Sequence, residues 1–245
     1  MAVRASSSRY RPDDSVSKAY ARRVRIVCVA DTHLFTDDFV VPAGDVFIHA
    51  GDLCRRGDLD ELEHAAAWLL SLPHRHKIVV AGNHDWAFAR HRHAALALLP
   101  DVIYLQDSLA EIAGLRVWGS PWQPAFHGWA FNLPRGEALA DRWALIPPGL
   151  DILVTHGPPQ GLGDGFTMHG RAGCADLRAR VAVVRPRLHV FGHIHQDGGA
   201  WLSDGTLFAN VTTWECNRAA TVVDVDASSV TAIDIPAHGR RDDYG

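Results

Sequence analysis

Two histidines, His193 and His195, stand one residue apart in the segment VFGHIHQ, directly after an apolar run. On a strand they would share one face, and in the turn after a strand they would converge on one small volume. Two imidazoles in such a place are typical of a metal site, but histidine pairs at this spacing also occur by chance. The pair alone therefore leaves both interpretations open.

Four further apolar runs end in polar clusters of the same kind. The clusters after the five runs are Asp31 with His33, Asp52, Asn83 with His84 and Asp85, His156, and His193 with His195. Ligand sites of α/β sheets lie beyond the carboxyl ends of the strands, so clusters from neighbouring strands of one sheet would meet at one edge. These groups exceed the needs of one tetrahedral zinc ion, and a carboxylate can bridge two ions. The pattern therefore favours two metal ions over one.

The elements that must position these clusters alternate between strands and helices at first and are mainly strands towards the end. β-branched and apolar runs between Gly, Pro and Asp predict strands, and apolar residues at helical spacing predict helices. The predicted strands are 24–30, 45–50, 77–81, 101–105, 151–155, 187–191, 205–211, 219–226 and 229–236, with a hairpin over 109–120. The predicted helices are 58–72, 86–98 and 174–184. This pattern indicates an α/β protein.

The size and charge of the chain limit the classes of function. Its 245 residues, 47% hydrophobic and 21% charged, can bury a large core. We expect one domain over 24–235, with a disordered tail at 1–23 and a C-terminal tail at 236–245. A formal net charge of −4 gives no general attraction to nucleic acids or anionic membranes, so neither is an expected partner. The oligomeric state is left open.

The cysteines and the first residues indicate the compartment. Cys28, Cys54, Cys174 and Cys216 form no CxxC pair, which argues against a zinc ribbon or a dense disulfide framework. The first residues lack the apolar segment of a secretory signal, and no run reaches the ~18 apolar residues of a membrane span. We therefore expect a soluble, cytoplasmic protein.

The clusters lie in a set of short sequence motifs that follow one another along the chain. They are Asp31-Thr32-His33, Gly51-Asp52, Gly82-Asn83-His84-Asp85, His156-Gly157 and Gly192-His193-Ile194-His195. Over about residues 24–226, this set resembles the calcineurin-like metallophosphoesterase superfamily. The stretches THGPP, GRAGCADL and ANVTTWECN are most similar to its metallophosphoesterase-domain-containing subfamily, the MPPED or UPF0046 group. The resemblance implies a four-layer α/β/β/α sandwich.

The resemblance also implies two divalent metal ions. The implied ligands of the first ion are Asp31, His33 and His195, those of the second are Asn83, His156 and His193, and the bridging ligand is Asp52. We expect manganese, with iron, zinc or nickel as alternatives. A bridging carboxylate offsets part of the charge of two close cations, and neutral imidazoles complete each set of ligands. A hydroxide shared by both ions would attack the phosphoester in line.

His84 is the cluster histidine that this scheme does not assign to a metal. It adjoins Asn83, and as a cation it could donate a proton to the leaving group or offset charge in the transition state. Asp85 would hold His84 in one tautomer. We therefore predict that His84 and Asp85 are catalytic, with a purely structural role for His84 as the alternative.

A Pro- and Gly-bounded segment at 120–136 combines several aromatic and polar residues. They are Trp122, Phe126, His127, Trp129 and Asn132. The segment is either a packed loop or a wall on which a base or an aromatic leaving group stacks, and Trp214 offers a further apolar surface.

The leading functional hypothesis is hydrolysis of a small phosphodiester, such as a cyclic nucleotide. The alternatives are a general phosphomonoesterase and a non-catalytic metal-site scaffold for protein interaction. The stretches GDLCRRGD and GNHDWAF lack the arginine positions of Ser/Thr protein phosphatases, although Arg55, Arg56 and Arg171 lie near motifs. A diester carries one negative charge and needs fewer cationic groups than a dianionic monoester, which favours the diester.

Overall fold

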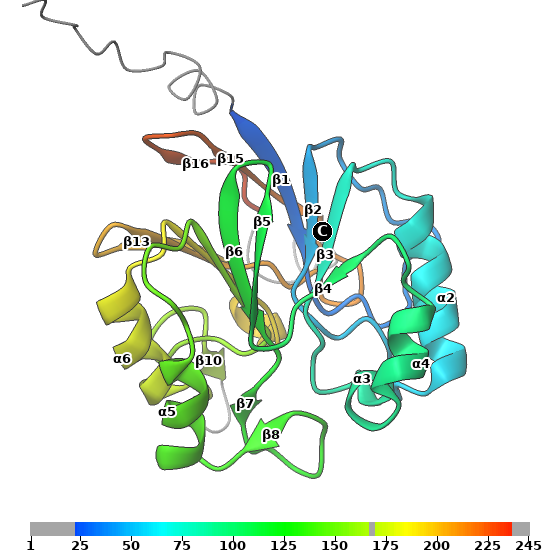
Figure 1. Cartoon of the computed structure of the whole chain (residues 1–245), viewed down its shortest axis with the longest axis horizontal. Coiled ribbons are helices and arrows are strands. Elements are labelled where there is room, and N and C mark those ends of the chain that lie inside the picture. Colours follow the sequence, from blue (N-terminus) through cyan, green and yellow to red (C-terminus); the bar gives the residue numbers. More distant parts are fainter. Residues whose placement is uncertain (1–22, 167–169, 237–245) are drawn as a thin grey trace, which may run out of the picture.

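Two six-stranded mixed sheets pack face to face in the computed structural model, which describes residues 23–166 and 170–236 (Figure 1). The first sheet has the order β16 (Val230–Asp234), β15 (Thr221–Val225), β1 (Val24–Val29), β2 (Val46–His49), β3 (His76–Val79) and β4 (Ile103–Tyr104). Its strands β1 to β4 are parallel, β15 pairs antiparallel with β1, and β16 pairs antiparallel with β15.

The second sheet is built in a similar way. Its order is β13 (Gly199–Ser203), β14 (Thr206–Asn210), β12 (Leu188–Phe191), β9 (Ile152–Thr155), β6 (Leu115–Ser120) and β5 (Ser108–Ile112). The four central strands are parallel, while β13 and β5 are antiparallel edges. Each sheet therefore has a parallel set whose carboxyl ends can form a ligand site.

Helices cover the outer face of each sheet (Figure 1). The first sheet packs against α2 (Leu59–Ser71), α3 (Trp86–Arg90) and α4 (Arg92–Ala97), and the second against α5 (Glu137–Ala144) and α6 (Ala175–Val184). Two short ladders, β7 (Gln123–Pro124) with β8 (Asn132–Leu133) and β10 (Gly165–Phe166) with β11 (Gly170–Arg171), and the 3-10 helix η2 (His195–Asp197) complete the fold. The predicted four-layer α/β/β/α sandwich is confirmed.

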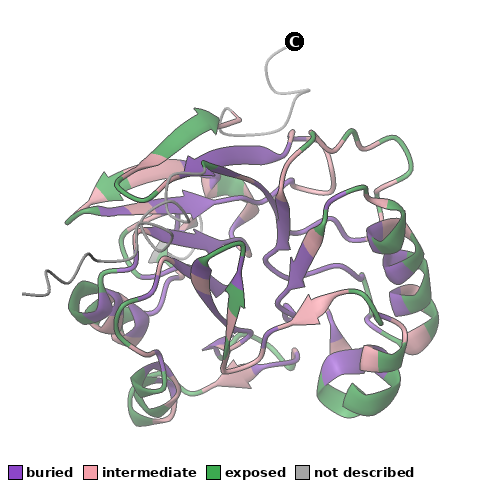
Figure 2. Ribbon diagram, turned by 45° about the horizontal axis from the view of Figure 1, so that its top comes forward, coloured by how far each residue is buried: buried purple, intermediate pink, exposed green. Residues whose placement is uncertain are grey.

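Alternate residues of β1 pack into two different apolar cores. Ile26 and Cys28 belong to the apolar cluster between the sheets, whereas Val27 and Val29 belong to the cluster beneath α2, and all four are fully buried. Because successive side chains of a strand point to opposite faces, a strand covered on both sides must be apolar throughout. Figure 2 shows this pattern as buried strands between helices whose outer faces are exposed. The double covering explains why the runs that precede the polar clusters are mainly apolar.

The start of α2 fixes the loop that follows β2. Asp58 caps the helix by accepting a hydrogen bond from the N–H of Glu61 at 2.9 Å. The Glu61 carboxylate in turn accepts from the N–H groups of Arg55 at 2.9 Å, Arg56 at 2.6 Å and Gly57 at 2.9 Å. The loop backbone, including the carbonyl of Arg55, is therefore held against the helix.

The structure differs from the sequence prediction in several elements. The helix expected over 86–98 is two helices, α3 and α4, which meet at His91. The sequence did not predict α5 or β13. The tails expected at 1–23 and 236–245 lie outside the described residues, except for Arg23, which pairs with Asp224 at 3.3 Å, and Pro236, whose carbonyl accepts from Arg218.

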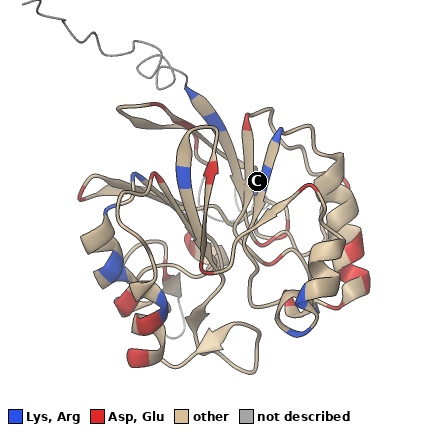
Figure 3. Cartoon of the chain, viewed as in Figure 1, with Lys and Arg blue, Asp and Glu red and all other residues tan. Residues whose placement is uncertain are grey.

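Charged residues of both signs are interspersed over the helices and strand ends in the view of Figure 3. Within residues 23–166 and 170–236, no helix combines the length and the apolarity that crossing a membrane requires.

Candidate metal centre

The polar clusters meet where parallel strands of both sheets end. Asp31, Asp52 and Asn83 follow β1, β2 and β3 of the first sheet, while His156 and His193 follow β9 and β12 of the second. The five strands are therefore divided between the two sheets. The two sets still converge, because Asn83 Oδ1 lies 2.9 Å from His156 Nε2 and the Asp31 carboxylate accepts the His193 N–H at 3.0 Å.

Three groups of side chains place potential ligand atoms within 4.8 Å of one another. The groups are Asp31, His33 and His195; Asp52, His156 and His193; and His33, Asp52 and His84. Asp52 belongs to two of them, and its Oδ2 lies 3.4 Å from His156 Nε2 and 3.9 Å from His33 Nε2. Imidazoles and carboxylates that share one carboxylate suit a pair of divalent ions. The residues present therefore fit a binuclear metal site.

Backbone carbonyls hold two of these imidazoles by the nitrogen opposite the cluster. His33 Nδ1 lies 2.9 Å from the carbonyl oxygen of Cys54, and His156 Nδ1 lies 2.9 Å from that of Ala50. Histidines that bind metals commonly donate their second ring N–H in this way, which fixes the tautomer and leaves the other nitrogen as the ligand atom. This arrangement supports a metal centre independently of the clustering.

The buried charges of the centre stabilise one another. Burial alone would raise the pKa of Asp52, but His156 and His33 hold it well below its usual range. Burial would lower the pKa of His156, but the charge and hydrogen bond of Asp52 outweigh it and raise the pKa to about 9. In the same way, His195 outweighs burial and keeps the pKa of Asp31 low. Both carboxylates are therefore ionised, as metal ligands must be.

Four of the clustered residues have left-handed backbone conformations. The φ angle is 57° at Asp31, 47° at His33, 59° at Asp52 and 72° at His193. Such conformations cost non-glycine residues on the order of 1–3 kcal/mol each, and they concentrate at functional sites. The turns after the strands therefore accept local strain at the positions of the potential ligands.

Close packing explains two glycines of the motifs. A Cβ atom at Gly82 would lie 2.2 Å from Asp52 Oδ1 and 2.7 Å from His156 Cε1, and one at Gly192 would lie 2.7 Å from Asp31 Oδ2. These distances are too short for any side chain, so only glycine lets the backbone approach both carboxylates. Gly82 and Gly192, each next to a potential ligand, are therefore needed for the close packing of the centre.

His84 is oriented by Arg55 and Trp129. Its Nδ1 lies 2.5 Å from the carbonyl oxygen of Arg55, and its backbone N–H donates to Asp52 Oδ1 at 2.8 Å. The indole of Trp129 lies on the imidazole, with ring centroids 4.1 Å apart and planes inclined by 32°. The expectation that Asp85 fixes the tautomer of His84 is wrong, because the Arg55 carbonyl makes that contact.

Asp85 ties together the turns that follow β2 and β3. Its fully buried carboxylate accepts the N–H groups of Gly82 at 2.7 Å, Asp52 at 2.9 Å and Cys54 at 3.0 Å. Burial and the nearby charge of Asp52 raise its pKa to about 6. Asp85 therefore positions the backbone of the turns that carry the potential ligands.

The aromatic residues between β6 and β8 have different surroundings. Trp122 donates its indole N–H to Asp107 at 2.8 Å and packs within the fold. Trp129 lies on His84, as described above. Phe126 is 48% exposed, and its ring centroid lies 6.4 Å from that of His193. This segment is thus partly packed scaffold and partly a wall of the candidate site.

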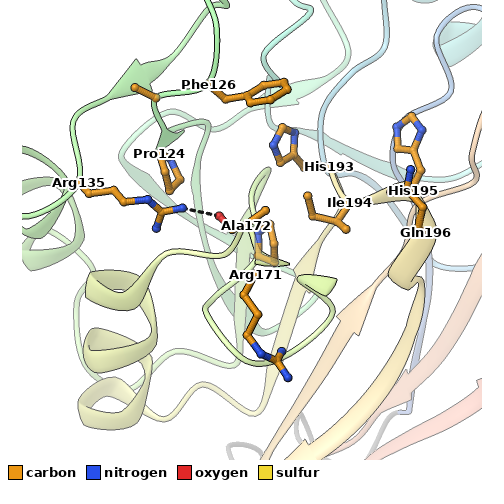
Figure 4. A pocket seen from close by; sticks show the side chains of 11 residues that line it. Pro124, Phe126, Arg135, Arg171, Ala172, His193, Ile194, His195 and Gln196 are labelled. Atoms are coloured by element: carbon orange, nitrogen blue, oxygen red, sulfur yellow. Dashed lines mark hydrogen bonds between the residues drawn. The ribbon is translucent and has the colours of Figure 1, made fainter. Parts of the chain in front are cut away.

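Two cavities adjoin the centre and share His195. One, of about 330 Å³, is lined by Pro124, Ala125, Phe126, Arg135, Pro158, Arg171, Ala172, His193, Ile194, His195 and Gln196 (Figure 4). The other, of about 380 Å³, is lined by His33, Arg55, Arg56, His84, His195 and Glu215. We call them the apolar cavity and the charged cavity.

Arg55 and Arg56 thus border the candidate site. Both arginines follow the Gly51-Asp52 motif in the sequence, and the cavity forms between their loop, His84, His195 and Glu215. Arg55 and Arg56 bring positive charge to the candidate site, so the missing protein-phosphatase arginines do not by themselves favour a diester. A choice between ester classes must rest on the cavities themselves.

The sequence is similar to those of known proteins. A family model described as calcineurin-like phosphoesterase matches residues 24–197. Metallophosphoesterase domain-containing protein 1 of Homo sapiens is 44% identical over 218 residues, which cover 79% of this chain and 67% of the human protein. A UPF0046 protein of Caenorhabditis elegans is 37% identical over 247 residues, which cover 88% of this chain and 61% of the nematode protein.

Solved structures share the fold at low sequence identity. TT1561 of Thermus thermophilus gives a TM-score of 0.57 at 13% identity, covering 87% of this chain and 99% of that one. A putative 5'-nucleotidase of Staphylococcus aureus gives a TM-score of 0.53 at 13% identity, covering 89% of this chain and 54% of that one. The family model and the sequence relatives, together with the His/Asp metal site, show that the chain belongs to the calcineurin-like phosphoesterase family of hydrolases.

Proposed function

We propose that the chain is a binuclear metallophosphoesterase that hydrolyses small phosphodiesters, with nucleotides among the candidate substrates. The observation that carries the proposal is the sharing of Asp52 between two groups of potential ligands. The proposed ligands are Asp31, His33 and His195 for one ion, Asn83, His156 and His193 for the other, and Asp52 for both. Manganese is the preferred metal, with iron, zinc or nickel as alternatives. Two such ions would supply positive charge to the phosphate and lower the pKa of the attacking water.

In this proposal His84 protonates the leaving oxygen. The Arg55 carbonyl holds Nδ1, so Nε2 is the nitrogen that can face a substrate, and His84 lines the charged cavity. Hydrolysis converts one diester and one water into a monoester and an alcohol. The alcohol takes its proton from His84, which regains one from solvent. Asp85 contributes by holding the backbone of Gly82 and Asp52 in place.

The pair of cavities supports a diester over a monoester. A diester carries two organic substituents on one phosphate, and His195, a proposed metal ligand, lines both cavities. A monoester would use only one of them. The positive charge of Arg55 and Arg56 is balanced in part by Glu215 in the same cavity, which suits a substrate of low charge.

The manganese-loaded protein is expected to hydrolyse bis-p-nitrophenyl phosphate with a higher kcat/KM than p-nitrophenyl phosphate, because only the diester occupies both cavities. Release of p-nitrophenolate under identical metal loading measures both values. Faster turnover of the monoester would identify a general phosphomonoesterase. A protein that binds two metals but turns over neither ester would be a scaffold.

Uptake of manganese by the metal-free protein is expected to be strongly pH-dependent. With a pKa of about 9, His156 carries a proton at neutral pH, and that proton must leave before its Nε2 can bind an ion. The apparent affinity should therefore rise about tenfold per pH unit up to the pKa and then level off. Calorimetric titrations in buffers of different ionisation enthalpy would show the released proton. An affinity that stays constant between pH 6 and pH 9 would contradict the proposed ligand role of His156.

A further inference from the structure

The apolar cavity has walls that suit a flat, uncharged group. Pro124, Phe126, Pro158 and Ile194 contribute apolar surface, and Ala125 adds a small side chain to the lining. Phe126 is 48% exposed although it lies beside His193, so its ring offers a contact surface next to a proposed metal ligand. In Figure 4 the Phe126 ring and the His193 imidazole lie close together on the same side of the cavity.

The two arginines of this cavity already have partners within the protein. Arg135 donates to the carbonyl oxygens of Gly173 at 2.7 Å and Ala172 at 2.8 Å, and Arg171 donates to Asp164 at 2.6 Å. Figure 4 shows the Arg171 guanidinium pointing away from the other labelled side chains. The cavity therefore selects its occupant by shape and apolar contact more than by charge.

The position of His84 distinguishes the two cavities. His84 lines the charged cavity, whereas His193 lines the apolar one. A general acid must reach the oxygen of the departing alcohol. The leaving group of a substrate therefore belongs in the charged cavity, and the substituent that remains on phosphorus is left to the apolar cavity.

We infer that the apolar cavity is the specificity site for the retained substituent of the diester and selects an aromatic or similarly flat apolar group there. This inference rests on the proposed function. The P–O bond to the alcohol in the charged cavity breaks, water supplies the new oxygen, and the product is a monoester whose ring remains beside Phe126.

Two substrates with the same leaving group test the inference. Phenyl p-nitrophenyl phosphate and methyl p-nitrophenyl phosphate both release p-nitrophenolate and differ only in the retained substituent. Burial of a phenyl ring favours the aryl substrate by about 10-fold to 100-fold in kcat/KM. The ratio of the two kcat/KM values, measured at one manganese loading, reports on the apolar cavity and cancels general losses of activity.

Variants of the cavity should change this ratio. Phe126→Ala is expected to lower it by about tenfold, Phe126→Leu by less, and Ala125→Phe, which adds a large side chain to the lining, should lower it by steric exclusion. The matched control is Leu202→Ala, an exposed apolar residue on β13 that lines neither cavity, and it should leave the ratio unchanged.

Binding of the products provides a readout without turnover. Phenyl phosphate should bind the manganese-loaded protein at least about tenfold more tightly than methyl phosphate, and Phe126→Ala should remove most of the difference. If diesters are hydrolysed but Phe126→Ala and Ala125→Phe leave the ratio of the two kcat/KM values unchanged, the inference is wrong and the proposed function still stands. Absence of turnover for every diester would overturn the proposed function and the inference with it.

Discussion

The Asp52→Ala variant is expected to lose both metal ions together and at least about 10³-fold of kcat/KM for a diester. Its carboxylate belongs to two groups of potential ligands, with Oδ2 near His156 and His33 and Oδ1 on the N–H of His84. Removing the Asp52 carboxylate takes negative charge from both ions at once. The expected loss of rate corresponds to an increase of several kcal/mol in the activation free energy. Elemental analysis together with p-nitrophenolate release would measure both changes.

Asp224→Ala provides a matched control for Asp52→Ala. Asp224 is 2% exposed, like Asp52, but it pairs with Arg25 at 2.9 Å at the opposite end of β1. This variant should lose stability yet keep two metals per chain. His195→Ala should deplete mainly the ion that it shares with Asp31. Retention of both metals and of full activity in Asp52→Ala would end the binuclear model.

Replacement of His84 by alanine should keep the metals and slow turnover, by about 10²- to 10⁴-fold for diesters with an alkoxide leaving group. The loss should be much smaller for p-nitrophenolate, which departs with little protonation. The comparison requires two diesters with the same retained substituent, and metal content measured on the same samples. His64→Ala, an exposed histidine of α2, is the control and should behave as the wild type.

The same experiment distinguishes a proton donor from a metal ligand. His84 also lies with His33 and Asp52 in one of the groups of potential ligand atoms. If His84 binds a metal, the His84→Ala variant should lose that ion and should hydrolyse the diesters with either leaving group more slowly by the same factor. Equal losses would therefore refute the acid role.

The family resemblance implied the four layers. The strand pattern itself predicted the gathering of the polar clusters, because each cluster directly follows a strand that is buried on both faces. The runs before Asp31, Asp52 and His156 are mainly apolar for that reason, and the chain direction alone places the clusters at carboxyl ends. The division of these strands between two sheets could not be predicted from them, since a buried strand looks the same in either sheet.

Contacts between distant loops could not be predicted either. Arg55 is 29 residues from His84, and its contact is made by a backbone carbonyl, which leaves no trace in residue type. The helix α5 escaped prediction because only Leu139 and Trp143 are buried, and two positions one turn apart give a weak periodic signal. The apolar cavity likewise combines residues of several loops, so its shape exists only after folding.

Because β15 pairs with β1 and β16 pairs with β15, the first sheet is complete only when the chain has been synthesised to about Asp234. Thr213 also anchors the turn that carries Asp31, since its N–H and Oγ1 both donate to the carbonyl of Ala30, at 2.8 and 2.9 Å. Every proposed ligand, up to His195, is therefore synthesised before these anchoring segments exist. The ion pair between Arg25 and Asp224 joins positions 199 residues apart, so closing this sheet carries the entropic cost of a very long loop. The metal centre is thus a late product of folding, because it needs segments that are synthesised after the last of its ligands.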